Sequence, residues 1–275
     1  MKGMNKDGSR KEPLLDLKQS FRLLFKNYDP FLKVQLFAII LTLLIFFIII
    51  GIGFVYRSIF GTIIQDTPIR YIGGSFIAIF SGFIWIFLTT TNGLAVDVIN
   101  SGDEFTEFSN AFKYLKKFWW KYALIALIVF GFPNIVQLII NHPRVHGAIQ
   151  DMPWEKVLIY EAVGLILSYV FYSLFMLVFP SVTTTGSIKN AFIENFRILK
   201  SDGKRVFGTW ALFFLVFQVP IYVFGTLTLI FQIAPFGIFW IIFMLLNLFI
   251  GMPLQYLMAA GMYFNTNFER FKPLD

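Results

Sequence analysis

The sequence contains no cysteine and only two histidines among its 275 residues. Without cysteine, the chain has no disulfide, no thiolate metal site and no cysteine nucleophile. The histidines, His142 and His146, are four positions apart, but Pro143 disfavours a helix there and no nearby carboxylate completes a ligand set. A solvated loop is the favoured interpretation of this stretch, and we expect neither a metal site nor a cofactor.

Sequence motifs of known enzyme classes are also missing. The chain has no Gly-rich phosphate loop, no zincin motif and no nucleophile elbow. It offers no soluble domain that could organise a nucleic-acid surface. The sequence therefore predicts a protein that is not an enzyme and that has no nucleic-acid partner.

Charge is scarce as well. Only 14% of the residues are charged and 57% are hydrophobic, with a mean hydropathy of +0.71. A soluble domain carries roughly 25% charged residues, so lipid is the expected solvent for most of this chain. Polar residues recur as far as Lys33, which is not typical of a signal peptide, and we expect the first apolar run to be a retained helix.

In place of charged residues, the chain contains long apolar runs. Six of them reach the length of about 20 residues that a bilayer-spanning helix needs. The runs are continuously apolar rather than alternating, which argues against a transmembrane barrel. Since backbone groups in lipid must be satisfied within the segment, we predict an all-α, polytopic membrane protein. The predicted transmembrane helices are Val34–Tyr56, Tyr71–Ala95, Tyr122–Ile140, Val157–Pro180, Val206–Phe231 and Phe236–Phe264.

Lysine and arginine are distributed unevenly around these runs. All but four of the 23 lie before the first run, between the second and third, between the fourth and fifth, or after the sixth. Because loops rich in these residues stay in the cytoplasm, we predict a multi-pass protein of the plasma membrane with both termini cytoplasmic. The four exceptions are Arg57, Arg70, Arg144 and Lys156.

Three of the predicted cytoplasmic segments have helical periodicity. Apolar residues recur three or four positions apart, with basic residues beside them. This pattern is typical of an amphipathic helix that lies in the plane of the membrane interface. The predicted apolar stripes are Leu17, Phe21, Leu24, Phe25 and Tyr28; Phe105, Phe108, Ala111, Phe112, Leu115 and Trp119; and Ile188, Ala191, Phe192, Phe196 and Leu199.

The chain also repeats itself. "TTTNG" begins at Thr89 and "TTTG" at Thr183, and each is followed by Asn-Ala-Phe within a basic, aromatic-rich segment. An interfacial helix, an outward span and a return span would then occur three times, in units 14–103, 104–186 and 187–275. All three units start on the cytoplasmic side, so the repeat is parallel. Chance similarity between basic inner loops is the alternative, and helix capping is the expected role of the threonines.

Prolines and polar residues interrupt the apolar runs. The prolines should kink their helices, and the nearby amides could bond the freed carbonyls, either as a hinge or broken-helix site or as a packed kink. Glu161 is either a functional carboxylate or a residue that reaches water at the outer boundary, and Asp97 is similar at the inner one. Asn247 suits either a midplane role or an interhelical hydrogen bond. The candidate intramembrane residues are Pro133, Asn134, Glu161, Gln218, Pro220 and Asn247.

The densest cations flank the predicted cytoplasmic helices. Each lysine or arginine near the inner leaflet attracts anionic lipid by about 1 kcal/mol. The orientation rule alone predicts much of this charge, so specific lipid recognition stays an open alternative. The candidate lipid or partner contacts are Lys113, Lys116, Lys117, Lys121, Arg197, Lys200, Lys204 and Arg205.

Two stretches carry a resemblance to a known group of proteins. They are Asn110–Lys117 with Trp119 and Trp120, and Asn190–Lys200 with Trp210. Their pattern resembles uncharacterised prokaryotic six-span membrane families, including the membrane domain attached to some glycerophosphodiester phosphodiesterases. The resemblance covers the membrane part only, and it implies a membrane module without hydrolase activity.

Three functions follow as hypotheses from the sequence. The first is a non-enzymatic membrane protein that organises or transports lipid-like or small substrates together with a partner. The second is the permease subunit of a transporter driven by a separate ATPase. The third is a membrane scaffold or assembly factor.

Overall fold

The computed structural model describes residues 13–60, 87, 89–100, 106–128, 154–231 and 233–267. Every regular element in these ranges is a helix, so the predicted all-α class is confirmed. Residues 89–100 are helical as well. The helices are α1 (Pro13–Lys26), α2 (Tyr28–Phe60), α4 (Phe108–Ala126), α7 (Trp154–Phe175), α8 (Val178–Thr185), α9 (Ile188–Phe213), η4 (Phe214–Gln218), α10 (Val219–Phe231), α11 (Ala234–Leu246), η5 (Asn247–Gly251) and α12 (Met252–Asn267).

Three stretches of the described chain are long and apolar enough to cross a membrane. They are Ala162–Thr185, Ile188–Thr228 and Ala234–Phe264, which overlap the last three predicted spans. The first predicted span lies inside α2, whereas the second and third fall mostly outside the described residues. A helical membrane protein is therefore supported, and the count of six spans stays a prediction.

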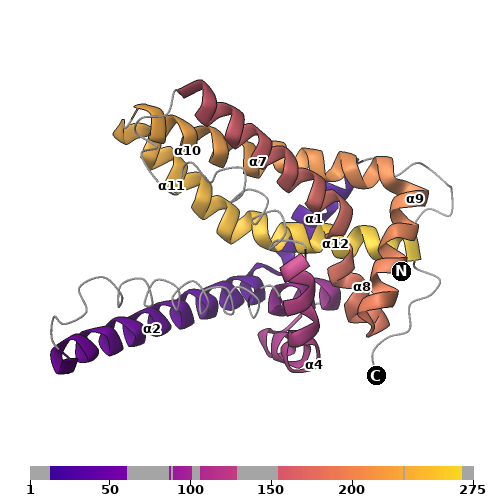
Figure 1. Cartoon of the computed structure of the whole chain (residues 1–275). Coiled ribbons are helices and arrows are strands. Elements are labelled where there is room, and N and C mark those ends of the chain that lie inside the picture. Colours follow the sequence, from indigo (N-terminus) through magenta and orange to yellow (C-terminus); the bar gives the residue numbers. More distant parts are fainter. Residues whose placement is uncertain are drawn as a thin grey trace.

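We call the part of the molecule with the mainly apolar helices α2, α7, α10 and α11 the apolar side, and the part with α1, α4, α8 and the start of α9 the polar end. In Figure 1, α2, α7, α10 and α11 extend to the left, while α1, α4, α8 and the start of α9 lie together on the right. None of the residues of α11 is buried, which is the pattern of a helix whose solvent is lipid. The polar end thus contains the parts that were predicted to be cytoplasmic, around the buried core.

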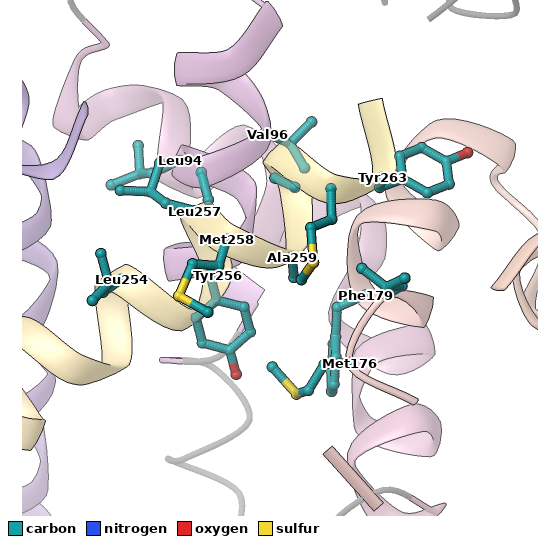
Figure 2. Close-up of a cluster of buried hydrophobic side chains, with 14 of the residues drawn as sticks. Leu94, Val96, Met176, Phe179, Leu254, Tyr256, Leu257, Met258, Ala259 and Tyr263 are labelled. Atoms are coloured by element: carbon teal, nitrogen blue, oxygen red, sulfur yellow. The ribbon is translucent and has the colours of Figure 1, made fainter. Parts of the chain in front are cut away.

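The core lies where residues 89–100, α8 and α12 meet (Figure 2). Figure 2 shows Tyr256 and Met258 of α12 near Phe179 of α8 and Met176. The rings of Phe179 and Tyr256 meet edge to face, with their centroids 5.9 Å apart. Burial at this end fixes the positions of the helices that continue into the apolar side.

Prolines shape two of the described helical stretches through the backbone that precedes them. A proline has no N–H, and its ring clashes with the carbonyl four residues earlier. Before Pro220 and Pro253 the chain forms the π-helical turns η4 and η5, in which Val219 and Met252 donate to the carbonyl five residues back. Leu127 and Ile128, six and five residues before Pro133, also have π-helical geometry, and Pro133 itself lies outside the described residues. The predicted interruption at Pro220 is therefore a π-helical turn within a continuous helix.

The three predicted amphipathic helices form, but their buried faces differ from the predicted stripes. On α4 the buried residues are Ala111, Tyr114, Phe118, Tyr122 and Ile125, at helical spacing. Two aromatic side chains of the predicted stripe turn outward instead, with Phe112 38% and Trp119 58% exposed, whereas Phe108 packs against the core. The tyrosines take the inward positions because their hydroxyls find hydrogen-bond partners there.

α9 consists of two helices that meet at a kink, one from a predicted interfacial segment and one from a predicted span. Its backbone leaves helical geometry at one residue, Asp202, where φ is −136° and ψ is 25°. The kink lies between Lys200 and Val206, where the sequence predicted the boundary between the two segments.

Gly93 tests how closely residues 89–100 pack against α4. A Cβ atom on Gly93 would lie 2.5 Å from the Cβ of Tyr114, which cannot be accommodated without moving one helix. We expect Gly93→Ala to lower the free energy of unfolding by about 2 kcal/mol, measured by thermal unfolding in detergent. Gly261→Ala in α12 is the matched control, since its Cβ would meet no atom within 4 Å. Equal unfolding temperatures for the two variants would contradict this packing.

Candidate functional site

The two threonine runs of the repeated motif meet in the buried core. Asn92, which follows the first run, donates from Nδ2 to the hydroxyl of Tyr122 and to Oγ1 of Thr183, the latter over 3.1 Å. The Tyr122 hydroxyl also contacts Thr183 Oγ1 and donates to the carbonyl of Phe179 over 3.2 Å. We call Asn92, Tyr122 and Thr183 the buried polar cluster. It joins residues 89–100, α4 and α8 through side chains that are almost completely removed from solvent.

The predicted capping role is not seen for Thr183, and Thr185 contributes to the start of α9 only by accepting from the N–H of Ser187 over 3.3 Å. Thr183 and Thr185 donate to carbonyls one turn earlier in their own helix, Phe179 over 3.1 Å and Ser181 over 2.9 Å. The N-cap of α9 is Ser187, whose Oγ accepts from the Asn190 N–H over 3.4 Å. Threonine is retained in the helix interior because its hydroxyl bonds backward to the backbone, which is more favourable than an unpaired group in a buried site.

The two glycines of the repeated motif also have different roles. Gly186 ends α8 in the left-handed conformation, with φ of 66°. Its carbonyl accepts from Nζ of Lys121 over 2.5 Å, which places a cation at the negative end of that helix. Gly93 instead lies within a continuing helix, where it allows the close approach of Tyr114.

Asp97 is half-buried and holds the beginning of α4. Its carboxylate accepts from Oγ1 of Thr106 over 2.5 Å, from Nδ2 of Asn110 over 2.9 Å and from the hydroxyl of Tyr114 over 3.3 Å. Burial, followed by the nearby Asp97 carboxylate, raises the pKa of Tyr114, so the phenol stays protonated and remains a donor. Asp97 therefore has a positioning role at the junction between residues 89–100 and α4.

Arg205 was predicted to be a lipid or partner contact, and this prediction is wrong because its side chain is buried. Its Nε and Nη2 each donate to the carboxylate of Asp16 over 2.5 Å, and Nη1 donates to Asp202 over 3.0 Å. Both Arg205 and Asp16 are buried. A guanidinium forms two parallel hydrogen bonds with a carboxylate, so it can enter a buried site in which a lysine could make only one such contact.

This ion pair attaches the N-terminal helix to α9. Gly208 lies one turn after Arg205, and a Cβ atom there would come within 2.8 Å of the ring of Pro13. The small residue thus lets α1 approach closely enough for Asp16 to reach Arg205. Asp16 was not among the predicted site residues, and its only sequence signal is an acidic residue within an otherwise basic amphipathic segment.

The other predicted cations remain at the surface. Lys113, Lys116 and Lys117 are exposed on α4, and Lys200 and Lys204 are exposed on α9. Arg197 is exposed and lies 3.6 Å from the carboxylate of Glu194. Lys117 and Lys121 each lie 5.5 Å from the centre of the Phe118 ring, within range of a cation–π contact.

Large aromatic side chains lie on α4 beside these lysines. Trp119 is 58% exposed and Trp120 is 47% exposed. We call the exposed lysines and aromatic residues of α4 the basic–aromatic face. It consists of Phe112, Lys113, Lys116, Lys117, Trp119 and Trp120.

The structure brings together two of the predicted intramembrane residues. Gln218 in η4 donates from Nε2 to Oδ1 of Asn247 in η5 over 3.2 Å. Gln35 of α2, which the sequence analysis did not select, donates to the carbonyls of Leu248 and Phe249 over 2.9 and 3.3 Å. A single amide in the apolar run after Lys33 was the available signal for Gln35.

The remaining predicted residues add little to this site. Pro133 and Asn134 lie outside the described residues, as do His142 and His146. Glu161 belongs to α7, but its side chain is outside the part that the structure describes. Within the described ranges, no three acidic or histidine side chains gather closely enough to hold a metal ion.

Comparison of the chain with protein-family models, with curated proteins and with solved structures finds no match. The resemblance to six-span membrane families therefore stays a prediction, and function has to be argued from the residues themselves.

Tyr122→Phe tests whether the buried polar cluster holds the three helices together. Loss of the hydroxyl leaves Asn92 and Thr183 short of a partner in a buried site, and we expect the free energy of unfolding to fall by about 2 kcal/mol. Thermal unfolding in detergent measures the change. Tyr169→Phe is the control, because that half-buried hydroxyl makes one bond, to the Phe207 carbonyl over 3.0 Å. A smaller loss for Tyr122→Phe than for Tyr169→Phe would contradict the role of the cluster.

Asp16→Asn tests the attachment of α1. The substitution removes the charge that balances Arg205, and we expect a loss of about 3 kcal/mol in the free energy of unfolding. Asp29→Asn breaks the exposed pair with Lys33 and should cost less than about 1 kcal/mol. Replacing both buried partners, as Asp16→Leu with Arg205→Met, should recover part of the loss because no charge is left unpaired. If Asp16→Asn and Asp29→Asn cost the same, the buried pair does not stabilise this contact.

Proposed function

We propose that the protein is a polytopic membrane protein that organises or transports lipid-like molecules at the cytoplasmic leaflet, together with a partner. The observation that supports this proposal is the basic–aromatic face of α4. Three lysines that make no contact with a carboxylate in the described part of the chain lie there beside two exposed tryptophans.

The chemistry of this face suits a membrane interface. Lysines close to the inner leaflet attract anionic headgroups, and tryptophan rings are enriched at the level of the headgroups. The opposite face of α4 is buried against the protein through Tyr114, Phe118 and Tyr122. Lipid headgroups are therefore the proposed partners of the outward side.

The same proposal includes six spans and three parallel units. Two contacts between interfacial helices and unit junctions support it. Asn27, at the end of α1, accepts from the N–H of Thr106 near the start of the second unit, over 3.3 Å. Lys121, towards the end of α4, donates to Gly186, immediately before the third unit. Each of these two helices thus contacts the junction that leads into the next one.

The double variant Lys116→Gln with Lys117→Gln tests the proposed lipid contact. At about 1 kcal/mol per lysine, we expect the affinity for fluorescent phosphatidylglycerol to fall about 30-fold, measured by anisotropy with the purified full chain. Binding of phosphatidylcholine, which has no net charge, should remain weak and unchanged.

Lys33→Gln is the matched control, because Nζ of Lys33 already lies 2.5 Å from the carboxylate of Asp29. We expect it to keep the affinity of the wild type for phosphatidylglycerol. Undiminished binding by the double variant would refute the proposal. Purification with a stoichiometric ATPase would then favour the permease hypothesis, and purification with another membrane protein would favour the scaffold.

A further inference from the structure

Two neighbouring helical stretches of the apolar side each contain a turn without regular α-helical hydrogen bonds. η4 precedes Pro220 and η5 precedes Pro253, each by the same spacing. In each, the regular bond to the fourth preceding residue is replaced by a bond to the fifth, and the proline contributes no N–H. Sharp changes in helix direction occur at such positions because fewer backbone bonds resist them.

These two turns are in contact with each other. The amides of Gln218 and Asn247 bond η4 to η5 over 3.2 Å. A Cβ atom on Gly251 would lie 2.4 Å from Oδ1 of Asn247 and 3.0 Å from the ring of Phe217. Glycine at this position therefore leaves room for the Asn247 amide within η5 and lets the Phe217 ring of η4 pack closely against η5. Gln35 bonds η5 to α2 through the carbonyls of Leu248 and Phe249.

Beyond these turns, α10 and α11 form a hairpin that packs upon itself. The ring of Phe224 stacks against those of Phe239 and Phe243, with centroids 5.3 and 5.4 Å apart. Gly225 lies against Trp240, whose Nε1 would be 3.2 Å from a Cβ atom there. Figure 1 shows the two helices side by side at the left of the molecule. The hairpin is thus held together by its own aromatic contacts.

On the other side of the turns, the same helices are anchored in the core. Trp210 and Phe213 of α9 are fully buried, as are Leu254 and Tyr256 of α12. A self-packed hairpin and a buried core are therefore joined by two adjacent π-helical turns.

We propose that the α10–α11 hairpin swings as one body about η4 and η5, with the bond between Gln218 and Asn247 as the lock that holds its resting position. Because η4 and η5 are in contact, the two helical stretches that contain them can bend at neighbouring positions. The aromatic contacts within the hairpin then stay intact. Gln35 fixes η5 to α2, which makes α2 the reference for the movement. This proposal does not depend on lipid binding by α4.

Because the chain has no native cysteine, spin labels can be attached at two introduced cysteines to measure the distance between the hairpin and α2. Spin labels at Ile48→Cys on α2 and Ile233→Cys at the hairpin tip, both exposed positions, report the distance between the two parts. Ile233 lies 14 residues from Asn247, a lever of about 20 Å, so a bend of about 20° moves it by about 7 Å. Double electron–electron resonance on the full chain in lipid nanodiscs resolves a shift of this size.

Two variants remove the lock from opposite sides. Asn247→Leu and Gln218→Met keep the side-chain volume and delete the amide bond, and we expect each to broaden the distance distribution and shift its maximum by about 7 Å. Adding Pro220→Ala and Pro253→Ala to the Asn247→Leu chain should narrow the distribution again, because regular helix can re-form. If one single variant fails to fold, the other measures the same bond.

Thr228→Val is the matched control within the hairpin. Its hydroxyl bonds only within α10, to the carbonyl of Phe224 over 2.7 Å, so we expect the distribution of the wild type. The proposal is overturned if the lock variants give the wild-type distribution, or if Thr228→Val shifts it as much as they do.

Discussion

Lipid offers no hydrogen bonds, and this constraint accounts for the polar contacts within the apolar side of the protein. Each backbone group or amide side chain in the apolar side needs a partner within the chain. Pro220 and Pro253 are tolerated because π-helical turns redirect the preceding N–H groups. Gln35 is tolerated because it donates to a backbone carbonyl of η5. Gln218 and Asn247 are tolerated because their amides bond to each other.

At the polar end, polar groups buried within the protein also need internal hydrogen-bond partners. Buried hydroxyls, amides and one ion pair connect helices that are distant along the chain, as in the buried polar cluster and the pair of Asp16 with Arg205. Such contacts require specific geometry, since a buried polar group without its partner costs free energy. These contacts hold helices of the polar end in specific positions relative to one another.

The two proposals place different activities at the two ends. The basic–aromatic face of α4 would contact lipid headgroups at the polar end, and the α10–α11 hairpin would move within the apolar side. The two regions are connected through α8, α9 and α12, whose buried residues form the core. Movement of the hairpin would therefore be anchored on the part of the protein that meets the membrane surface.

The sequence by itself determined the helical class, the apolar spans of α7 to α12 and the existence of the amphipathic helices. These properties depend on length, hydropathy and periodicity, which are local and additive along the chain. Gln218, Pro220 and Asn247 were selected because a polar residue or proline in an apolar run needs an explanation wherever it occurs, and the structure places them in or beside η4 and η5.

Only the tertiary structure decided what individual residues do. Arg205 looked like one more surface cation, and its partner Asp16 lies 189 positions away. Gly93 and Gly186 follow similar threonine runs, yet one permits close helix packing and the other ends a helix. In α4, hydrogen bonding turned the tyrosines inward and left Trp119 outside. The physical reason is common to all three: a side chain's role depends on the partner it meets, and long-range partners leave no local pattern in the sequence.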